Sequence, residues 1–299
     1  MITHYSGKQN LIYKSTLIPN VLKTVSKKIS LFLLLLTLIV SNTGNSVYSQ
    51  SKDSLKNSEM KVIGIIGGIS WASSIDYYKL MNEMVRDRFG SLYSANILMY
   101  SIPFKEFSDQ ERLAEAGDWK PIINMMIESA KRLERGGADF IVIASNTMNS
   151  TVEILEKNVN IPILHIADAT GEKIKEKGLK KVALLGTKFT MEHKFYKERL
   201  KNKFGLDVVV PTLEERDFIN KVIFDELCNN YIVEDSKIQY LKIINRLIKE
   251  EGVEGIILGC TEIPMLVKQE DVSVPVFNTT VIHSEAAVNY SVGLKQIIK

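Results

Sequence analysis

Cysteine and histidine are scarce in this chain, which has two cysteines and four histidines among its 299 residues. Two cysteines cannot form the disulfide framework that stabilises many small exported domains. No Cys-x-x-Cys or His-x-x-x-His spacing occurs, so the sequence gives no support for a metal site. The chain also lacks the third glycine of a dinucleotide fingerprint and the Gly-Lys-Ser/Thr of a phosphate loop, and we expect no cofactor.

Strong charge of one sign is also missing. The formal net charge at pH 7 is +3, which is too small to indicate a nucleic-acid partner. With 45% hydrophobic and 24% charged residues, the composition is typical of one or two globular domains with well-formed cores.

The longest apolar run lies near the N-terminus, at residues 29–40, directly after two lysines. A bilayer span needs about 20 apolar residues, and this run is shorter. The order of basic residues, apolar core and small residues, with Val47 and Ser49 at the expected cleavage site, predicts a signal peptide over residues 1–49. We therefore expect an exported protein, periplasmic or secreted. The alternative is an uncleaved leader that anchors the chain to the membrane.

The chain from residue 61 onward repeats one pattern of strands and helices. Residues 50–60 are polar and read as a linker. The segments KVIGIIGG, NILMYSI and FIVIAS then read as buried strands separated by amphipathic helices, and KKVALLGT, LDVVVP and GIILGC repeat the order. This alternation predicts an α/β fold of two similar lobes, each a parallel sheet flanked by helices. We expect a pseudo-twofold axis between the lobes and an active-site cleft at their boundary.

The lobe boundaries follow from this repeat. Residues 61–165 together with 275–299 should form the first lobe, and residues 166–274 the second. The short strand at residues 274–277 and the helix after it follow a completed second unit. We therefore expect both to pack back on the first lobe.

Two strand ends in the repeat carry unequal polar residues. Without gaps, GGADFIVIASNTMNS aligns with EGVEGIILGCTEIPM and sets Ser145 against Cys260. Ligands of parallel sheets collect at the carboxyl ends of strands, so a pseudo-twofold axis would place this pair on opposite walls of one cleft. A cysteine there can have its pKa lowered from about 8.5 and act as a base. Two opposed proton carriers suit inversion at a carbon atom, as in racemases and epimerases.

Other strand-end turns offer hydroxyls and lysines that suit a compact anionic ligand. These candidate binding residues are Ser70, Lys105, Thr187, Lys188 and Thr190. Cys228, in contrast, lies on a helical pattern, and we expect it to matter little.

Several segments together resemble the aspartate/glutamate racemase family, particularly its broad amino-acid racemase branch. The resemblance is carried by IGIIGGISWASSIDYYKLMNE, GADFIVIASNTMN, LLGTKFTMEHKFY, GIILGCTEIPML and VFNTTVIHSEAAV, among others, and covers residue 61 to the C-terminus. It implies a cofactor-independent enzyme of two α/β lobes that acts on a small acidic amino acid, aspartate or glutamate, with one cysteine per lobe as base and acid.

The resemblance also assigns individual residues. Cys260 matches the second-lobe cysteine, and Asn146 and Thr147 match residues that hold the substrate's α-carboxylate and amino group. Thr261 matches a similar role across the cleft. Glu262 stands where glutamate racemases have histidine, which favours aspartate.

Three positions depart from the family pattern. Ser145 replaces the first-lobe cysteine, Asn149 replaces a histidine, and Asn278 replaces an aspartate. A hydroxyl is a far weaker acid than a thiol and needs a neighbouring base. We therefore expect racemisation that is faster from the L-isomer, whose proton the second-lobe cysteine removes.

Two other functions stay open at this point. A decarboxylase of the same superfamily would need only Cys260, and an exported amino-acid-binding protein would need neither proton carrier. A homodimer is the expected assembly because it is the commonest oligomer.

Overall fold

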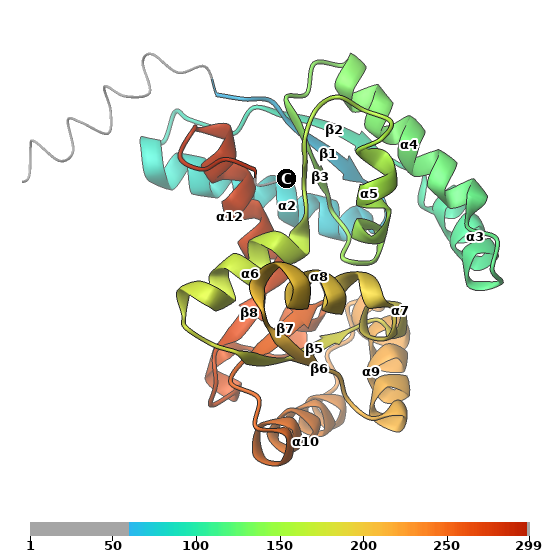
Figure 1. The fold of residues 1–299 in the computed structure, drawn as a ribbon, viewed down its shortest axis with the longest axis vertical. Coiled ribbons are helices and arrows are strands. Elements are labelled where there is room, and N and C mark those ends of the chain that lie inside the picture. The colour runs from blue at the N-terminus through green and yellow to red at the C-terminus, as the bar shows by residue number, and fades with distance from the viewer. Residues whose placement is uncertain (1–59, 298–299) are drawn as a thin grey trace, which may run out of the picture. The chain divides into compact units, whose positions relative to one another are not determined.

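The computed structural model describes residues 60–297, which form two four-stranded parallel sheets (Figure 1). The predicted signal peptide and nearly all of the linker lie outside the described residues. The strand order is β2-β1-β3-β4 in the first sheet and β6-β5-β7-β8 in the second, so each strand of one lobe has a counterpart at the same place in the other. The predicted fold class is confirmed.

The strands are short, as the apolar runs predicted. Those of the first sheet are β1 (Ile63–Gly67), β2 (Ile97–Ser101), β3 (Phe140–Ile143) and β4 (Ile163–Leu164). Those of the second are β5 (Lys181–Gly186), β6 (Asp207–Val209), β7 (Ile256–Gly259) and β8 (Val276–Asn278).

Both faces of each sheet are buried. Ile141 and Ile143 of β3 belong to one core cluster, while Phe140 and Val142 belong to another on the opposite face. Successive side chains of a strand point to opposite faces, so a strand covered by helices on both sides is apolar throughout. This is why these strands read as continuous apolar runs.

Helices of the first lobe follow its strands in the predicted order. They are α2 (Trp71–Phe89), α3 (Phe104–Glu115), α4 (Lys120–Arg135), η1 (Thr147–Thr151) and α5 (Val152–Leu155). The connecting helix α6 (Ile166–Glu176) leads into the second lobe. Figure 1 shows α3 and α4 side by side, with α3 reaching outward from the first sheet.

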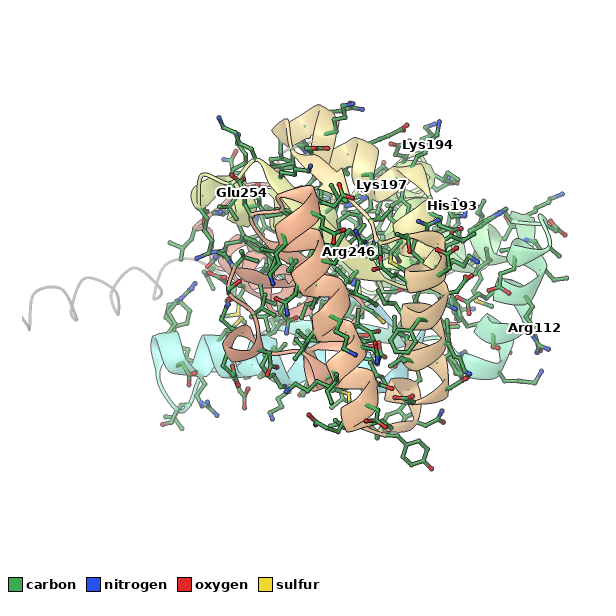
Figure 2. All side chains as sticks on the ribbon, turned by 90° about the horizontal axis from the view of Figure 1, so that it is seen from below. Arg112, His193, Lys194, Lys197, Arg246 and Glu254 are labelled. Atoms are coloured by element: carbon green, nitrogen blue, oxygen red, sulfur yellow. The ribbon has the colours of Figure 1, made fainter. Side chains whose placement is uncertain are left out.

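More helices follow the strands of the second sheet than those of the first. They are α7 (Lys188–Glu192), α8 (Lys194–Phe204), α9 (Leu213–Asp225), η2 (Leu227–Asn229), α10 (Glu234–Glu251), α11 (Ile263–Leu266), η3 (Gln269–Asp271) and α12 (Thr279–Ser291). Helix α9 begins with a capping box between Thr212 and Glu215. The same Glu215 accepts a hydrogen bond from Nε of Arg246 on α10 at 2.7 Å, which joins the two helices. Figure 2 labels this arginine on α10.

The lobes exchange their last helices. Helix α6 follows the last strand of the first sheet, yet its Ile166 and Ile174 pack in a core cluster with Val182 and Leu184 of β5. Helix α12 follows the last strand of the second sheet, yet its Ala287 and Val288 pack with β1 and α2 of the first lobe. The two exchanged helices also contact each other. Each lobe therefore completes the core of the other.

This exchange corrects the predicted boundary at the C-terminus. Strand β8 pairs with β7 in the second sheet, through Ile256 and Val276, and does not join the first sheet. It continues the parallel hydrogen bonding of its own sheet, just as β4 does beside β3. The expectation that this strand joins the first lobe was therefore wrong. The helix after it contacts α2 of the first lobe.

A buried histidine fastens α12 to the first lobe. His283 has Nε2 at 2.9 Å from the carbonyl oxygen of Leu164 and Nδ1 at 2.9 Å from the hydroxyl of Tyr77. A carbonyl can only accept, so Nε2 carries the proton and Nδ1 accepts from the tyrosine. Burial lowers the pKa of His283 to about 4, which keeps the ring neutral at physiological pH.

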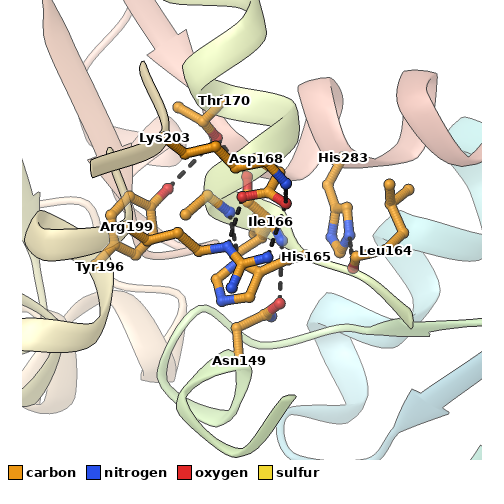
Figure 3. A network of polar contacts seen from close by, with 11 residues as sticks. Asn149, Leu164, His165, Ile166, Asp168, Thr170, Tyr196, Arg199, Lys203 and His283 are labelled. Atoms are coloured by element: carbon orange, nitrogen blue, oxygen red, sulfur yellow. Dashed lines mark hydrogen bonds and ion pairs between the residues drawn. The ribbon is translucent and has the colours of Figure 1, made fainter. Parts of the chain in front are cut away.

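A charged cluster fastens α6 to α8, as Figure 3 shows. Asp168 accepts hydrogen bonds from Arg199 (Nη2 to Oδ2, 2.9 Å) and from Lys203 (Nζ to Oδ2, 2.8 Å). Burial works to raise the pKa of Asp168, but the hydrogen bonds from the two cations outweigh it and hold the pKa below its usual range.

We predict that Asp168→Asn lowers the free energy of unfolding by about 2 kcal/mol, because it leaves two half-buried cations without their carboxylate. The contribution of Asp168 is present above the pKa of an unfolded aspartate, about 3.9, and is lost as the pH falls through the lower pKa of the folded state. Urea unfolding at pH 7 and pH 3 measures both effects.

Asp109→Asn is the matched control, because Asp109 also pairs with a lysine and an arginine but at an exposed surface. It should leave the urea midpoint unchanged. Equal midpoint shifts in the two variants would contradict a special role for the α6–α8 junction.

Candidate active site

A cavity of about 390 Å³ lies where the carboxyl ends of strands from both lobes meet. The first lobe contributes the turn after β1, the start of α3 and the turn after β3, and the second contributes the turn after β7 and the segment from α9 to η2. Its size is within the range of small-molecule sites. We refer to this cavity as the cleft.

Ser145 and Cys260 both line the cleft, from opposite lobes. Ser145 follows β3 and Cys260 follows β7, the third strand of each sheet in spatial order. The predicted placement of the two residues at matching strand ends around one cavity agrees with the structure.

Cys260 is the first member of a hydrogen-bonded chain that joins the two lobes at the wall of the cleft. Its Sγ donates to Oε2 of Glu262 at 3.0 Å, and the hydroxyl of Thr261 donates to the same oxygen at 2.6 Å. Oγ of Ser73, on α2 of the first lobe, lies 2.7 Å from Oγ1 of Thr261. Since the Thr261 proton is directed to Glu262, Ser73 is the donor in that contact. The carboxylate is thus placed to receive the proton of the thiol.

The pKa of Cys260 differs from the sequence-based expectation. Burial raises the pKa well above the usual value of a thiol, and both the negative charge of Glu262 and its hydrogen bond add to the shift. The expectation of a lowered pKa was wrong, because the sulfur is buried and its partner is a carboxylate rather than a cation. Cys260 therefore rests as a thiol, with the Glu262 carboxylate in hydrogen-bond contact as the acceptor for its proton.

Ser145 has a different environment. Its Oγ accepts a hydrogen bond from the amide of Met148 at 3.3 Å, and no carboxylate or imidazole among residues 60–297 is bonded to it. Asn149 lies behind the serine, donates to the carbonyl of Ser145 at 2.7 Å and accepts from the amide of Ile166 at 3.0 Å. The asparagine therefore ties the strand end to the first turn of α6, and the hydroxyl stays without a base.

Asn146 offers an acceptor to a ligand. Its Nδ2 donates to Thr279 Oγ1 at 3.1 Å, and Thr279 donates in turn to the carbonyl of Leu258 at 2.8 Å. This fixes the amide so that Oδ1, which is buried, has no partner in the described part of the chain. A buried acceptor without a donor costs about 1–3 kcal/mol, so an ammonium group bound there would be strongly favoured.

Three threonines lie together at the lobe boundary. Thr147 Oγ1 is 3.4 Å from Thr187 Oγ1 and 3.3 Å from Thr190 Oγ1, and Thr187 is 3.1 Å from Thr190. Thr147 and Thr187 line the cleft, whereas Thr190 is buried behind them as part of the cap of α7. The structure brings these three predicted residues together. Thr190 does not line the cleft but contacts the two threonines that do.

Ser70 lines the cleft as the N-cap of α2, where its Oγ accepts from the amide of Ser73 at 3.3 Å. The turn before it depends on Gly68, whose φ is +81° and whose Cβ, if present, would lie 2.1 Å from the carbonyl oxygen of Ile102. Only glycine fits there. The close approach of the two chain segments is what brings the start of α2 to the cleft.

The two predicted lysines do not line the cleft. Lys105 donates to Asp109 one turn along α3, at 2.6 Å, and its side chain is 80% exposed. Arg112 on the same helix also pairs with Asp109 and points outward (Figure 2). Lys188 pairs with Asp217 and lines a smaller neighbouring pocket instead. Both ammonium groups already have carboxylate partners, which explains why they are not directed at a ligand.

Sequence reasoning missed several residues of the cleft wall. Ser73, Glu111, Cys228 and Asn229 line it, with the aromatic residues Trp71, Phe104, Phe107 and Phe224. The pKa of Cys228 is raised to about 12 by desolvation and by the charges of Glu262 and Glu111. Ser73 and Trp71 lie within the GGISWASS segment and could have been found there. The others lie on helices whose rotation about their axes the sequence does not reveal.

Residues 60–297 contain neither a metal-binding cluster nor a membrane-spanning helix. No group of three or more His, Cys, Asp or Glu side chains in this range is arranged to hold a metal ion. Over the same residues, the helices are too short or too polar to cross a bilayer.

Comparisons with known proteins agree on one family. The family model described as Asp/Glu/Hydantoin racemase matches residues 66–287. The broad specificity amino-acid racemase RacX of Bacillus subtilis is 23% identical over 237 residues, which cover 76% of this chain and 97% of that protein.

Solved structures are similar over the same region. An aspartate racemase homologue from Pyrococcus horikoshii is 40% identical, with a TM-score of 0.69, and the match covers 78% of this chain and 99% of that one. A proposed Asp/Glu racemase from Yersinia pestis is 44% identical, with a TM-score of 0.73 and the same coverage of both chains.

We predict that Glu262→Gln speeds the alkylation of Cys260 by iodoacetamide at pH 8. Removing the carboxylate removes a charge and a hydrogen bond that raise the pKa of the thiol, so more thiolate is present, on the order of tenfold for each pKa unit recovered. Mass spectrometry of cysteine-containing peptides over time gives the rate at each cysteine separately.

Glu111→Gln is the matched control, because the Glu111 charge acts on the pKa of Cys228. It should speed alkylation of Cys228 more than that of Cys260. An unchanged Cys260 rate in Glu262→Gln would show that the carboxylate does not control the sulfur.

Proposed function

Because this chain belongs to the Asp/Glu/Hydantoin racemase family, we propose that it is an amino-acid racemase that works without a cofactor at the α-carbon of its substrate. The observation that carries the proposal is the pair of proton-bearing side chains, Ser145 and Cys260, at matching strand ends of one cleft. Aspartate and glutamate are the first substrates to test, since racemases of both amino acids are named among the relatives.

In the proposed reaction the Cys260 thiol first gives its proton to Glu262. The resulting thiolate removes the α-proton of the L-isomer, and a proton returns to the opposite face from Ser145 or from a water molecule that it positions. The net change in the substrate is inversion at the α-carbon. Glu262 then releases its proton to solvent and Ser145, or the water molecule, regains one from solvent, which restores the starting state of the enzyme. Desolvation in the cleft makes the thiolate harder to form, but it also makes the thiolate a stronger base towards the α-proton once it has formed.

Polar residues around the pair suit the common part of every amino acid. The free Oδ1 of Asn146 can accept from the α-ammonium group, and the hydroxyls of Thr147 and Ser70 can donate to the α-carboxylate. These contacts would hold the α-carbon between the two walls. They do not depend on the substrate's side chain.

The decarboxylase and the binding protein are not proposed here. The thiol of Cys260 donates a hydrogen bond to the carboxylate of Glu262, and such a contact suits a side chain that releases and takes up a proton. A protein that only binds amino acids does not need it. Export and homodimer formation remain expectations from the sequence. The N-terminal residue of the mature chain and its mass in solution are the measurements that test them.

We predict that wild-type protein in deuterated water exchanges the α-proton of L-amino acids and that Cys260→Ala loses this exchange while keeping its circular dichroism spectrum. General acid-base catalysis contributes roughly 10²- to 10⁴-fold, which sets the size of the loss. Proton NMR of L-aspartate and L-glutamate follows the exchange. Cys228→Ala should retain most of it, and wild-type exchange in Cys260→Ala would exclude the proposed base.

Ser145 should make the two directions kinetically unequal. We expect wild type to exchange L-substrates much faster than D-substrates, because the hydroxyl has no neighbouring base, and we expect Ser145→Cys to raise D-substrate exchange. The gain should be about tenfold, or 1.4 kcal/mol. This is smaller than the full effect of a proton carrier, because Asn149 cannot act as a base beside the new thiol.

Initial exchange rates of both enantiomers at saturating substrate measure this effect, because kcat can differ between the enantiomers. Ser145→Ala is the companion variant, since it removes the hydroxyl without adding a thiol. If Ser145→Cys leaves D-substrate exchange unchanged and Ser145→Ala leaves L-substrate racemisation unchanged, Ser145 is not a proton carrier.

A further inference from the structure

Glu111 is an acidic residue of the cleft wall that the proposed proton transfers do not use. It lies on α3 of the first lobe and lines both the cleft and the smaller neighbouring pocket. Phe224 of α9 lines the same two cavities, and Cys228 and Asn229 of η2 line the cleft. The carboxyl group therefore lies in the part of the cleft that α3 and the α9–η2 segment form.

Within residues 60–297 this carboxyl group has no counter-ion and accepts no hydrogen bond. Burial raises the pKa of Glu111 to about 7, and repulsion from Glu115 adds to the shift. A partly buried carboxyl group without a donor is destabilised, and a cation brought beside it would restore the ionised form. A positive ligand group beside Glu111 would therefore stabilise the ionised carboxylate.

The walls near Glu111 also suit a cation with an aliphatic chain. Phe104 and Phe107 lie on the same helix and line the cleft, and Phe224 lines it from the second lobe. Aromatic rings pack against methylene groups and attract a cation over their faces. A ligand carboxylate at the same place would be repelled by the charge of Glu111. The nearby ammonium group of Lys188 would not offset this repulsion, because it is already paired with Asp217.

We propose that Glu111 is a specificity-determining residue that selects amino acids whose side chain ends in an ammonium or guanidinium group. The inference rests on the proposed function, because it assumes that the α-carbon lies between Ser145 and Cys260. The substrate's backbone groups then occupy the asparagine and threonine side of the cleft, and a long side chain extends along the aromatic residues to Glu111. Aspartate and glutamate are accepted more slowly than basic amino acids.

The test compares L-lysine with L-norleucine, which has the same chain length without the ammonium group, and with L-glutamate. At pH 8, where Glu111 is ionised, wild type should exchange the α-proton of lysine with a kcat/KM about tenfold above that of norleucine and further above that of glutamate. Glu111→Gln should reduce the ratio of lysine to norleucine to near one. Glu115→Gln is the matched control, because Glu115 lines only the smaller pocket, and it should preserve the ratio.

Binding measured by calorimetry with the Cys260→Ala protein separates the selectivity from turnover. Lysine should bind about tenfold more tightly than norleucine, and a Cys260→Ala/Glu111→Gln double variant should lose the difference. If wild type exchanges no amino acid but lysine binding still depends on Glu111, the racemase proposal fails and the selectivity proposal holds. If lysine has no advantage over norleucine in either measurement, or keeps it without Glu111, the selectivity proposal is overturned.

Discussion

The structure depends on the reciprocal exchange of α6 and α12 between the lobes. Each of these helices follows the last strand of its own sheet and then covers a face of the other sheet, so neither lobe has a complete core alone. The exchange explains why polar groups are buried along it. His283 and Asp168 each fasten one of the exchanged helices, and each has hydrogen-bond partners that satisfy it.

This constraint places the cleft. Since α12 begins directly after Asn278, its Thr279 can reach both Leu258 of β7 and Asn146 of the first lobe. Asn149 likewise connects the end of β3 to the first turn of α6. The side chains that face a ligand are therefore held by the same segments that hold the lobes together. A site positioned in this way on strand ends and helix starts is better defined than one on free loops.

Much of the fold could be predicted because its periodicity is strong. Continuous apolar strands and amphipathic helices alternate twice, and the alignment of Ser145 with Cys260 follows from that repeat alone. The partner of the C-terminal strand could not be read in this way, because a parallel strand can join either sheet and local sequence does not decide which. The pairing of Lys105 with Asp109 was visible as an i, i+4 spacing on one helix and argues against a ligand role.

The pKa of Cys260 and the presence of Glu111 in the cleft were beyond the sequence for a different reason. Both depend on which way a side chain points: Glu262 turns back to the sulfur two residues before it, and α3 turns Glu111 toward the second lobe. Ion pairing and burial act over a few ångströms, a scale that residue spacing along the chain does not resolve.

The two walls of the cleft differ both in the proton-bearing side chain and in the groups that are hydrogen-bonded to it. The second-lobe wall holds a thiol with a carboxylate that can take its proton, whereas the first-lobe wall holds a hydroxyl bonded only to a backbone amide. If both walls act on one α-carbon, the barrier for removing a proton must be lower on the side of Cys260, because only that side has an acceptor for the proton of its acid. The equilibrium between enantiomers is fixed by their equal free energies and cannot follow this asymmetry. The ratio kcat/KM for racemisation is therefore the same in both directions. An unequal pair can still give the L- and D-isomers different kcat values, and each difference in kcat is balanced by a matching difference in KM.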